Sequence, residues 1–409
     1  MNSIKSYAVV TGAYWSFMLT DGAIRMLILL YFHRLGYSPV TLAFLFLLYE
    51  FFGMLTNLFG GWFGQKYGLK APLIWGLSIQ PVALIGLSFL NHDWPAAVAI
   101  PFVMTMQSLS GIAKDLTKMS SKTAIKYLIP QQKNALLFKW VAVLTGSKNA
   151  VKGAGFFVGG FLLQYFGFSN ALIILALLIL VSLGGSLLFL PPRIGAPAQP
   201  KPFQGLFRQQ KNIKILSAAR VFLFAARDIW FVVAIPIYFS RTLGWTHSQV
   251  GTFMAVWVII YGGVQAGAPA LLGRKTKRAP GKTTTMTISC ILTAVMGAIT
   301  LLFHTVPHPE IIIIAGLFLF GAAFAVNSSV HSYLVLAFAH GDTAATNVGF
   351  YYMANAGGRL TGTFLSGILF QWGGVSAALA GSTVFLIITT AITGILPDSS
   401  KTDISQKMP

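Results

Sequence analysis

The sequence predicts an all-α, polytopic membrane protein in which twelve transmembrane helices form two pseudo-repeats of six. Of its 409 residues, 55% are hydrophobic and 9% are charged, whereas soluble domains carry roughly 25% charged residues. Apolar runs of about 20 residues, the length that crosses roughly 30 Å of hydrocarbon, recur along the chain. Residues 207 positions apart also match one another. Twelve spans fill the length and leave no room for a large soluble domain.

Turns that contain glycine, proline or asparagine separate most of the predicted helices. The proline-rich segment after residue 190 is the one evident linker, and it divides the spans six and six. We therefore expect an N-terminal bundle (1–190), a cytoplasmic linker (191–212), a C-terminal bundle (213–397) and a polar cytoplasmic tail (398–409). The predicted spans are 6–33, 39–64, 71–91, 96–128, 135–165, 168–190, 213–240, 247–273, 282–304, 309–338, 344–371 and 374–396.

Basic residues concentrate in alternate loops, and this asymmetry predicts the orientation. Lys66 and Lys70 follow the second span, Lys133 follows the fourth, and Arg274 begins a basic loop after the eighth. The loops of the other side hold mainly histidines and a few arginines. Because cytoplasmic loops carry the excess of Lys and Arg, both termini are expected to be cytoplasmic.

Composition and motifs exclude several classes of protein. The formal net charge of +20 does not indicate nucleic-acid binding, because no basic soluble module presents it. Cys290 is the only cysteine, so neither a disulfide framework nor a cysteine metal site is expected. No metalloprotease, P-loop or dinucleotide motif is present, and we expect no enzyme activity, metal or cofactor. The first apolar segment contains the charged residues Asp21 and Arg25, so it does not resemble the apolar region of a cleavable signal peptide.

The two halves repeat each other. Tyr31-Phe32-His33-Arg34-Leu35-Gly36 matches the segment 238–244 with one inserted residue, and the offset of 207 places Asp21 on Asp228, Lys152 on Arg359 and Gly155 on Gly362. A parallel repeat of two six-helix halves resembles the major facilitator superfamily. The loop from Gly61 to Lys70 resembles that superfamily's G-x-x-x-D-R-x-G-R-K motif, with Gln65 and Leu69 departing from it. The segment Gly155-Phe156-Phe157-Val158-Gly159-Gly160 resembles an antiporter motif without its proline, or else serves helix packing.

Ionisable residues within the spans indicate function, because each costs several kcal/mol unless it faces a cavity or a partner. These residues fall on the predicted spans 1, 2, 4, 5, 7 and 11. In the superfamily that the repeat resembles, those spans line the central cavity. Nine basic residues face four acidic ones, so we predict a cationic cavity that binds an anion. The basic residues are Arg25, Lys114, Lys118, Lys122, Lys148, Lys152, Arg220, Arg227 and Arg359, and the acidic ones are Asp21, Glu50, Asp115 and Asp228.

Lysines at four-residue spacing form a slowly turning stripe on the fourth span, since each is displaced by about 40° from the last. We expect Lys114 and Lys118 to contact the substrate, Lys122 to lie on its entry path or to snorkel, and Lys126 to be interfacial. Lys148 and Lys152 are one turn apart on the fifth span and are further candidates.

The C-terminal half offers a different set of candidates. Arg359 is the repeat mate of Lys152, and its guanidinium can hold an oxyanion bidentately. Arg227 is a candidate for the same role, whereas Arg220 is expected to be structural. His331 is either a satisfied core histidine, a ligand contact or a proton-coupling group. The residues that could hydrogen-bond a polar ligand are Asn327, Tyr351, Tyr352 and Asn355.

The acidic residues are candidates for ion pairs or proton coupling. Asp21 and Arg25 are four residues apart and could pair on one helix face. Glu50 could take up a proton or form a structural hydrogen bond. Asp115 and Asp228 each adjoin a basic residue in sequence.

Long blocks of the sequence resemble the ArsJ organoarsenical efflux permeases. They include Leu19-Thr20-Asp21-Gly22-Ala23-Ile24-Arg25-Met26, Ser110-Gly111-Ile112-Ala113-Lys114-Asp115-Leu116 and Val326-Asn327-Ser328-Ser329-Val330-His331-Ser332-Tyr333. The resemblance implies a bacterial inner-membrane protein that exports 1-arseno-3-phosphoglycerate. It also implies, as functional partner, the glyceraldehyde-3-phosphate dehydrogenase that makes this compound in arsenic-resistance operons.

The predicted function is therefore efflux of an organic anion by a monomer in the lipid bilayer, through rocker-switch alternating access. Export of a multiply charged anion could run as a uniport, and proton antiport or phosphate exchange are alternatives. Other functions that the residues leave open are an organophosphate:phosphate antiporter, a proton-coupled drug antiporter and a non-transporting receptor.

Overall fold

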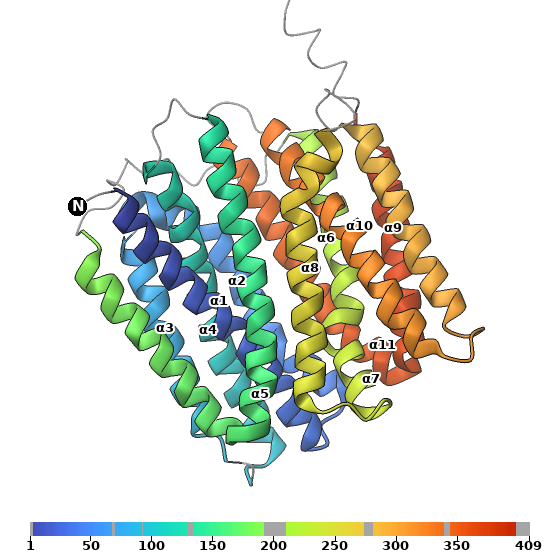
Figure 1. Ribbon diagram of the computed structural model, residues 1–409, viewed down its shortest axis with the longest axis horizontal. Helices are drawn as coiled ribbons and strands as arrows, with labels where there is room; N and C mark the ends of the chain where they lie inside the picture. The colour runs from blue at the N-terminus through green and yellow to red at the C-terminus, as the bar shows by residue number, and fades with distance from the viewer. Residues whose placement is uncertain are drawn as a thin grey trace, which may run out of the picture. The chain divides into compact units, whose positions relative to one another are not determined.

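Figure 1 shows the protein as a computed structural model, in which residues 3–67, 70–91, 93–128, 134–191, 210–273, 281–338 and 344–397 are described. All regular elements in these ranges are helices, as the composition predicted. They are α1 (Ser3–Arg34), α2 (Pro39–Tyr67), α3 (Lys70–Ser88), α4 (Ala96–Leu128), α5 (Asn134–Phe189), α6 (Lys211–Ile229), the π-helix η1 (Trp230–Ala234), α7 (Ile235–Arg241), α8 (His247–Gly273), α9 (Lys282–Leu302), α10 (Pro309–Phe338) and α11 (Ala344–Gly394).

Ten helices in the described part of the chain are long and apolar enough to cross a membrane. Two of them bend sharply at glycines, α5 at Gly167 and α11 at Gly373 and Gly374. Each bent helix is long enough for two crossings of about 20 residues. With α6, η1 and α7 forming one continuous span, the helices account for the twelve predicted spans, and the predicted fold class is confirmed.

The left-handed glycines of the described residues fall into two repeat-related pairs. Gly36 (φ 82°) and Gly244 (φ 67°) end the first helix of each half, and Gly167 (φ 76°) and Gly374 (φ 63°) make the later bends. A side chain with a Cβ rarely adopts this backbone conformation. The same turn chemistry therefore stands at matching positions of both halves, which supports the predicted repeat.

The span from α6 to α7 is widened at η1. Pro236 has no N–H, and its ring excludes the carbonyl of the preceding turn, so the regular hydrogen-bond ladder is interrupted. Ser366 of α11 compensates, because its Oγ accepts the N–H groups of Val233 (3.1 Å) and Ala234 (3.2 Å). The sequence prediction of one helix over 213–240 missed this π-helical segment.

The chain forms two compact units. Unit 1 contains Met1–Phe203 and Ile235–Gly262, and unit 2 contains Gln204–Ala234 and Gly263–Pro409. Unit 1 therefore includes α7 and most of α8 from the second half of the sequence. The division into 1–190, 191–212, 213–397 and 398–409 stays a prediction. Most of the linker and the whole tail lie outside the described residues.

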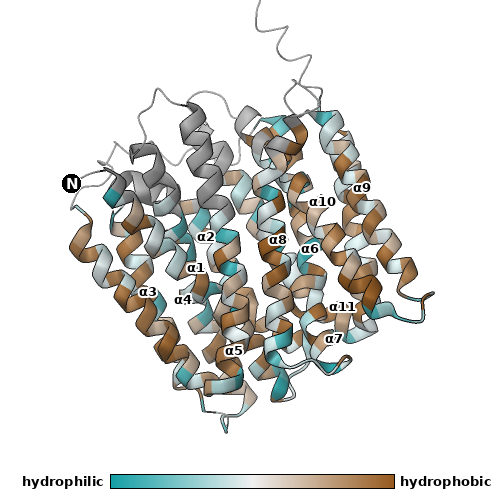
Figure 2. Ribbon diagram, in the orientation of Figure 1, coloured by the Kyte–Doolittle hydropathy of each residue, from teal (hydrophilic) through white to brown (hydrophobic). Residues whose placement is uncertain are grey.

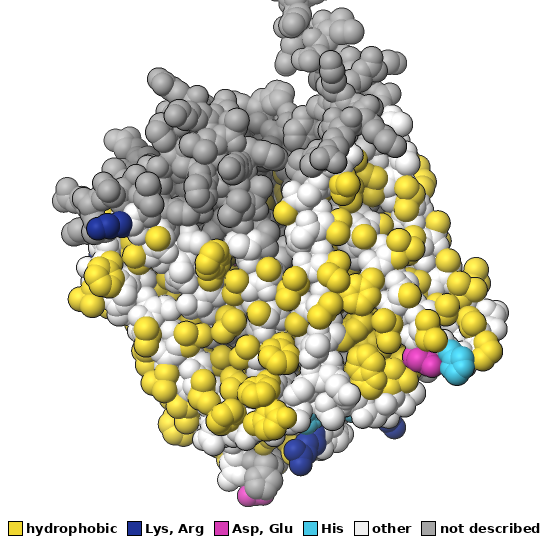
Figure 3. All heavy atoms as spheres, viewed as in Figure 1, with side chains coloured by type: hydrophobic (Ala, Val, Ile, Leu, Met, Phe, Trp, Pro, Cys, Tyr) yellow, Lys and Arg dark blue, Asp and Glu magenta, His cyan; other side chains and the backbone are white. Residues whose placement is uncertain are grey.

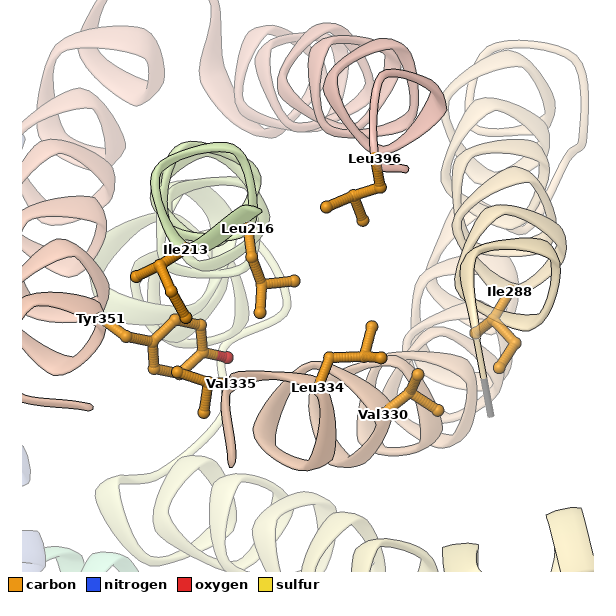
Figure 4. Packing of buried hydrophobic residues seen from close by; sticks show 8 residues of the cluster. All are labelled: Ile213, Leu216, Ile288, Val330, Leu334, Val335, Tyr351 and Leu396. Carbon is orange, nitrogen blue, oxygen red and sulfur yellow. The ribbon is translucent and has the colours of Figure 1, made fainter. Parts of the chain in front are cut away.

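Apolar side chains cover the helices outside and fill each unit inside. Hydropathy colouring shows many hydrophobic residues along the helices (Figure 2), and the described Lys, Arg, Asp, Glu and His side chains visible in Figure 3 lie near the margins of the view. Within unit 2, side chains of α6, α9, α10 and α11 and the residue Leu396 pack together (Figure 4). The cluster consists of Ile213, Leu216, Ile288, Val330, Leu334, Val335, Tyr351 and Leu396.

Candidate functional site

Asp21 of α1 is the centre of a buried charge cluster in unit 1. Its Oδ1 accepts a hydrogen bond from the Tyr49 hydroxyl of α2, and its Oδ2 lies 2.5 Å from Lys152 Nζ of α5. Gly22 and Gly155 let α1 and α5 approach this closely, because a Cβ at Gly22 would collide with the Lys152 carbonyl. The helix crossing therefore fixes the ion pair.

Arg25 lies one turn further along α1 and forms a second buried pair. Its Nη2 is 2.6 Å from Glu50 Oε1 on α2. The guanidinium also lies over the rings of Phe46 (5.2 Å) and Tyr49 (5.4 Å). Sequence spacing had offered Asp21 as the partner of Arg25, whereas the structure shows Arg25 against Glu50.

The lysine stripe of α4 packs against α2. Asp115 Oδ1 is 2.9 Å from Lys118 Nζ, and Asp115 Oδ2 is 3.6 Å from Lys114 Nζ. Lys114 Nζ lies 4.0 Å from the centre of the Tyr49 ring, and Lys118 Nζ donates to Asn57 Oδ1 at 2.9 Å. One carboxylate thus serves two lysines.

Glycines again permit this approach of α2 and α4. A Cβ at Gly53 would lie 2.7 Å from Asp115 Oδ2, and one at Gly111 would collide with the Tyr49 carbonyl. Lys148 is partly buried on α5, one turn before Lys152. The side chain of Lys122 lies outside the described residues. The cluster in unit 1, hereafter the unit 1 charge cluster, comprises Asp21, Arg25, Tyr49, Glu50, Asn57, Lys114, Asp115, Lys118 and Lys152.

Asp228 of α6 is the corresponding carboxylate of unit 2. Arg227 Nη2 is 2.5 Å from Asp228 Oδ1, and Arg359 Nε of α11 is 3.5 Å from Asp228 Oδ2. A Cβ at Gly362 would lie 2.6 Å from the Ala225 carbonyl, so α6 and α11 cross as closely as α1 and α5. The unit 2 charge cluster comprises Arg227, Asp228 and Arg359.

The repeat relation therefore extends to the ion pairs. The offset that places Asp21 on Asp228 also places Lys152 on Arg359, and both carboxylates lie beside their repeat-related cations. The contact is 2.5 Å in unit 1 and 3.5 Å in unit 2. Sequence reasoning had matched these four positions but had not paired them across helices.

One polar candidate of unit 2, Asn355, is in contact with Arg220. Its Nε donates to Asn355 Oδ1 at 2.9 Å, its Nη1 donates to the Ser328 carbonyl at 3.3 Å, and its guanidinium lies 3.9 Å from the Phe224 ring centre. Arg220 is buried, and the structural role expected for it stays a prediction. Asn355 is therefore held by Arg220 in this structure.

His331 and Asn327 are buried one turn apart on α10. Asn327 Nδ2 donates to Ser289 Oγ of α9 at 3.0 Å, whereas Asn327 Oδ1 and both ring nitrogens of His331 make no hydrogen bond to any described residue. Tyr352 is partly buried and packs against the apolar cluster of Figure 4.

Two members of the unit 1 charge cluster, Tyr49 and Asn57, were not predicted. Tyr49 links two parts of the cluster, since its hydroxyl contacts Asp21 and its ring lies beneath Lys114. Asn57 contacts Lys118. Both are polar residues within an apolar span, and this signal could have identified them. Tyr49 adjoins Glu50, and Asn57 follows Glu50 by about two helical turns.

Comparison with known proteins identifies the family. The sequence pattern described as Major Facilitator Superfamily matches residues 10–230 and 216–407. The chain is 26% identical over 216 residues to a Na(+), Li(+), K(+)/H(+) antiporter of Planococcus maritimus. This match covers 49% of either protein, so the chain spans about half the length of that relative.

Solved structures share the fold at low sequence identity. A D-xylose-proton symporter superposes with a TM-score of 0.74 at 14% identity, over 97% of this chain and 98% of that one. A POT family transporter in complex with 5-aminolevulinic acid gives a TM-score of 0.73 at 14% identity, over 94% and 95% of the two chains. Taken together with the match along nearly the whole sequence, these findings show that the chain belongs to the Major Facilitator Superfamily and is a multi-pass membrane transporter.

Proposed function

We propose that this transporter exports a multiply charged organic oxyanion, specifically the arsenate ester 1-arseno-3-phosphoglycerate. The observation that carries the proposal is a surplus of positive charge within the described spans. Eight basic side chains stand against the four carboxylates of Asp21, Glu50, Asp115 and Asp228. The basic ones are Arg25, Lys114, Lys118, Lys148, Lys152, Arg220, Arg227 and Arg359.

The internal ion pairs do not remove this surplus. Asp115 is shared by Lys114 and Lys118, and Asp228 is shared by Arg227 and Arg359. One carboxylate cannot neutralise two cations, so part of the positive charge remains. Such charge is costly at membrane depth. A ligand with several negative charges would relieve that cost.

The residue types suit a pentavalent oxyanion. Lysine provides a point charge, and arginine provides a planar fork that matches phosphate or arsenate oxygens. An anion at these clusters would compete with Asp21 for Lys152 and with Asp228 for Arg359. The lone Cys290 lies exposed on α9, so no thiol pair for trivalent arsenic is available in the sequence.

The membrane potential is sufficient to drive such export. Each negative charge that leaves an inside-negative cell gains about 2.3 kcal/mol per 100 mV. We place the protein in a bacterial inner membrane with both termini cytoplasmic. There it would act as a monomer after the glyceraldehyde-3-phosphate dehydrogenase that makes the ester. The specific substrate and this partner rest on the ArsJ-like sequence blocks, and the anionic class rests on the charge clusters.

A second candidate is cation:proton antiport. The partial match to a Na(+), Li(+), K(+)/H(+) antiporter favours it, and Asp21 and Asp228 would then be the exchanging carboxylates. The surplus of cations argues against this candidate, because it would repel a metal cation. Organophosphate:phosphate exchange uses the same cationic clusters and differs from the proposal only in its ligand.

Arsenate tolerance of cells that express the transporter with or without the dehydrogenase tests the proposal. We expect tolerance and arsenic export only when both proteins are present. Tolerance that does not need the dehydrogenase would exclude the named substrate. Uptake of labelled 3-phosphoglycerate into phosphate-loaded vesicles would favour phosphate exchange, and sodium-driven proton movement would favour the antiporter.

A further inference from the structure

Residues 235–262, from the second half of the sequence, pack against α5 through direct backbone contact, and α7 also contacts α1. A Cβ at Gly160 of α5 would collide with the His247 carbonyl at the start of α8. A Cβ at Gly251 would lie 2.7 Å from the Phe156 carbonyl, and one at Gly153 would lie 2.9 Å from the Ala255 carbonyl. The three glycines therefore hold α5 and α8 together along about two turns or more of each helix.

A side-chain contact reinforces this packing at the end where α8 begins. Gln164 Oε1 accepts hydrogen bonds from Ser248 Oγ at 2.7 Å and from Ser248 N–H at 3.3 Å. Gln164 lies three residues before the bend of α5 at Gly167. The contact thus closes unit 1 at the end that holds the loops 35–38 and 242–246.

Four basic residues gather at the same end. His33 and Arg34 end α1, Arg241 ends α7, and His247 begins α8. The two histidines are partly buried, and the two arginines are exposed. Arg241 acts electrostatically on His33, and Arg34 and His33 act on His247. Among the described residues, the groups that act on the two imidazoles in this way are therefore basic.

The described residues that the other elements contribute here are mostly uncharged. α1 and the following loop contribute the phenols of Tyr31 and Tyr37, and α5 contributes Gln164 and Tyr165. Asp93, in the loop between α3 and α4, is the one carboxylate in the described loops at this end of unit 1.

We propose that this closed end is an acid-sensitive gate, which opens when His33 and His247 are protonated. Two more positive charges would then join Arg34 and Arg241 across the contact between α1 and residues 235–262. Like charges at short range repel, and histidine is the side chain that changes charge at mildly acidic pH. The open state separates these groups, so proton binding shifts the population towards it. In the proposed orientation the end faces the cell exterior, and external acid would favour release of the transported molecule.

Distance measurements between spin labels test the gate without reference to any substrate. Cys290→Ser removes the only native cysteine, and Tyr165→Cys on α5 with Thr242→Cys after α7 places two labels at exposed positions on either side of the contact. Gly160→Val in this background inserts a side chain against the His247 carbonyl. It should give the longer, open distance at every pH, which calibrates the readout.

We expect one short distance at pH 7.5 and a second, longer distance at pH 5.5, with the longer population rising at least threefold. His33→Gln together with His247→Gln should abolish this change with pH. His308→Gln, which alters an exposed histidine of unit 2 beside Glu310, should leave it intact. A wild-type distribution that does not change with pH would overturn the proposal, as would a change that persists in the doubly substituted protein.

Discussion

Asp21 with Lys152 in unit 1 and Asp228 with Arg359 in unit 2 are equivalent by repeat, yet they differ in their surroundings. The Asp21 carboxylate holds Lys152 at 2.5 Å and accepts the Tyr49 hydroxyl. The Asp228 carboxylate holds its neighbour Arg227 at 2.5 Å, and Arg359 stands 3.5 Å away. The same positions thus give a tight pair in one unit and a loose one in the other.

This difference separates two tasks that one ion pair can perform. A tight buried pair stabilises a helix crossing, because removing one partner leaves an uncompensated charge. An arginine that lies 3.5 Å from a carboxylate already paired with its neighbour can exchange that carboxylate for a ligand oxyanion more readily than a cation at 2.5 Å can. We therefore assign the mainly structural role to Lys152 and the larger ligand-binding role to Arg359.

The largest effect is expected at the close helix crossings that glycines permit in both units, α1 with α5 and α6 with α11. Gly155→Leu and Gly362→Leu should both prevent folding, because the new side chain would enter the backbone of α1 or α6. The yield of monodisperse protein in detergent measures this. Gly184→Leu is the matched control on α5, since a Cβ there meets nothing within 4 Å. Normal yield of either crossing variant would show that the crossings are not tight.

The next effect separates the two units. Lys152→Ala should lower the free energy of unfolding by about 3–5 kcal/mol, the cost of breaking a buried pair. Arg359→Ala should lower it by about 1 kcal/mol, because Asp228 keeps Arg227. Thermal unfolding of both variants in the same detergent gives the comparison. Equal destabilisation would remove the distinction between the tight and the loose pair.

A smaller effect is expected from Lys118, which shares Asp115 with Lys114. Lys118→Met should weaken binding of a phosphorylated anion about tenfold, which corresponds to about 1.4 kcal/mol, without loss of folded protein. Titration calorimetry with 3-phosphoglycerate measures the change. Lys5→Met, at an exposed position near the start of α1, should bind as the wild type does. Unchanged affinity in Lys118→Met would remove this lysine from the site.

A further difference between the units is the π-helix, which is present in unit 2 at the position equivalent to a regular part of α1. Ser366 occupies the position that Gly159 has in the first half. Ser366→Gly should lower the free energy of unfolding by about 1–3 kcal/mol, because the N–H groups of Val233 and Ala234 lose their acceptor. Thr361→Val, which removes a hydroxyl bonded only to its own helix, serves as the control. Equal stability of the two variants would contradict this account of η1.

Hydrophobic runs and turn residues in the sequence were sufficient to predict the helices and their repeat. The length of an apolar run defines a membrane span almost independently of the neighbouring helices. The bends at Gly167 and Gly374 lie at positions that the offset of 207 relates to each other. The π-helix was not predictable, because it depends on Ser366 of another helix. The same holds for Tyr49 and Asn57, whose roles come from α4 packing against α2.

The charged residues were identifiable from the sequence, but their partners were not. Spacing within one helix suggested Asp21 for Arg25, whereas the structure sets Arg25 against Glu50 of α2. Pairing across helices depends on the rotation of each helix, and that rotation is set by close glycine contacts such as Gly22 with Gly155. A single sequence shows where these glycines are, but it does not show which helix packs against each of them.

Tracer uptake into vesicles tests the central claim that the charge clusters carry a multiply charged oxyanion. Wild-type protein and Lys214→Ala, which removes an exposed lysine of α6, should accumulate labelled 3-phosphoglycerate in response to an inside-positive potential. Arg359→Ala, folded and equally abundant, should accumulate it at least tenfold more slowly. Uptake by Arg359→Ala at the wild-type rate would contradict the account, as would wild-type vesicles that move cations and no oxyanion.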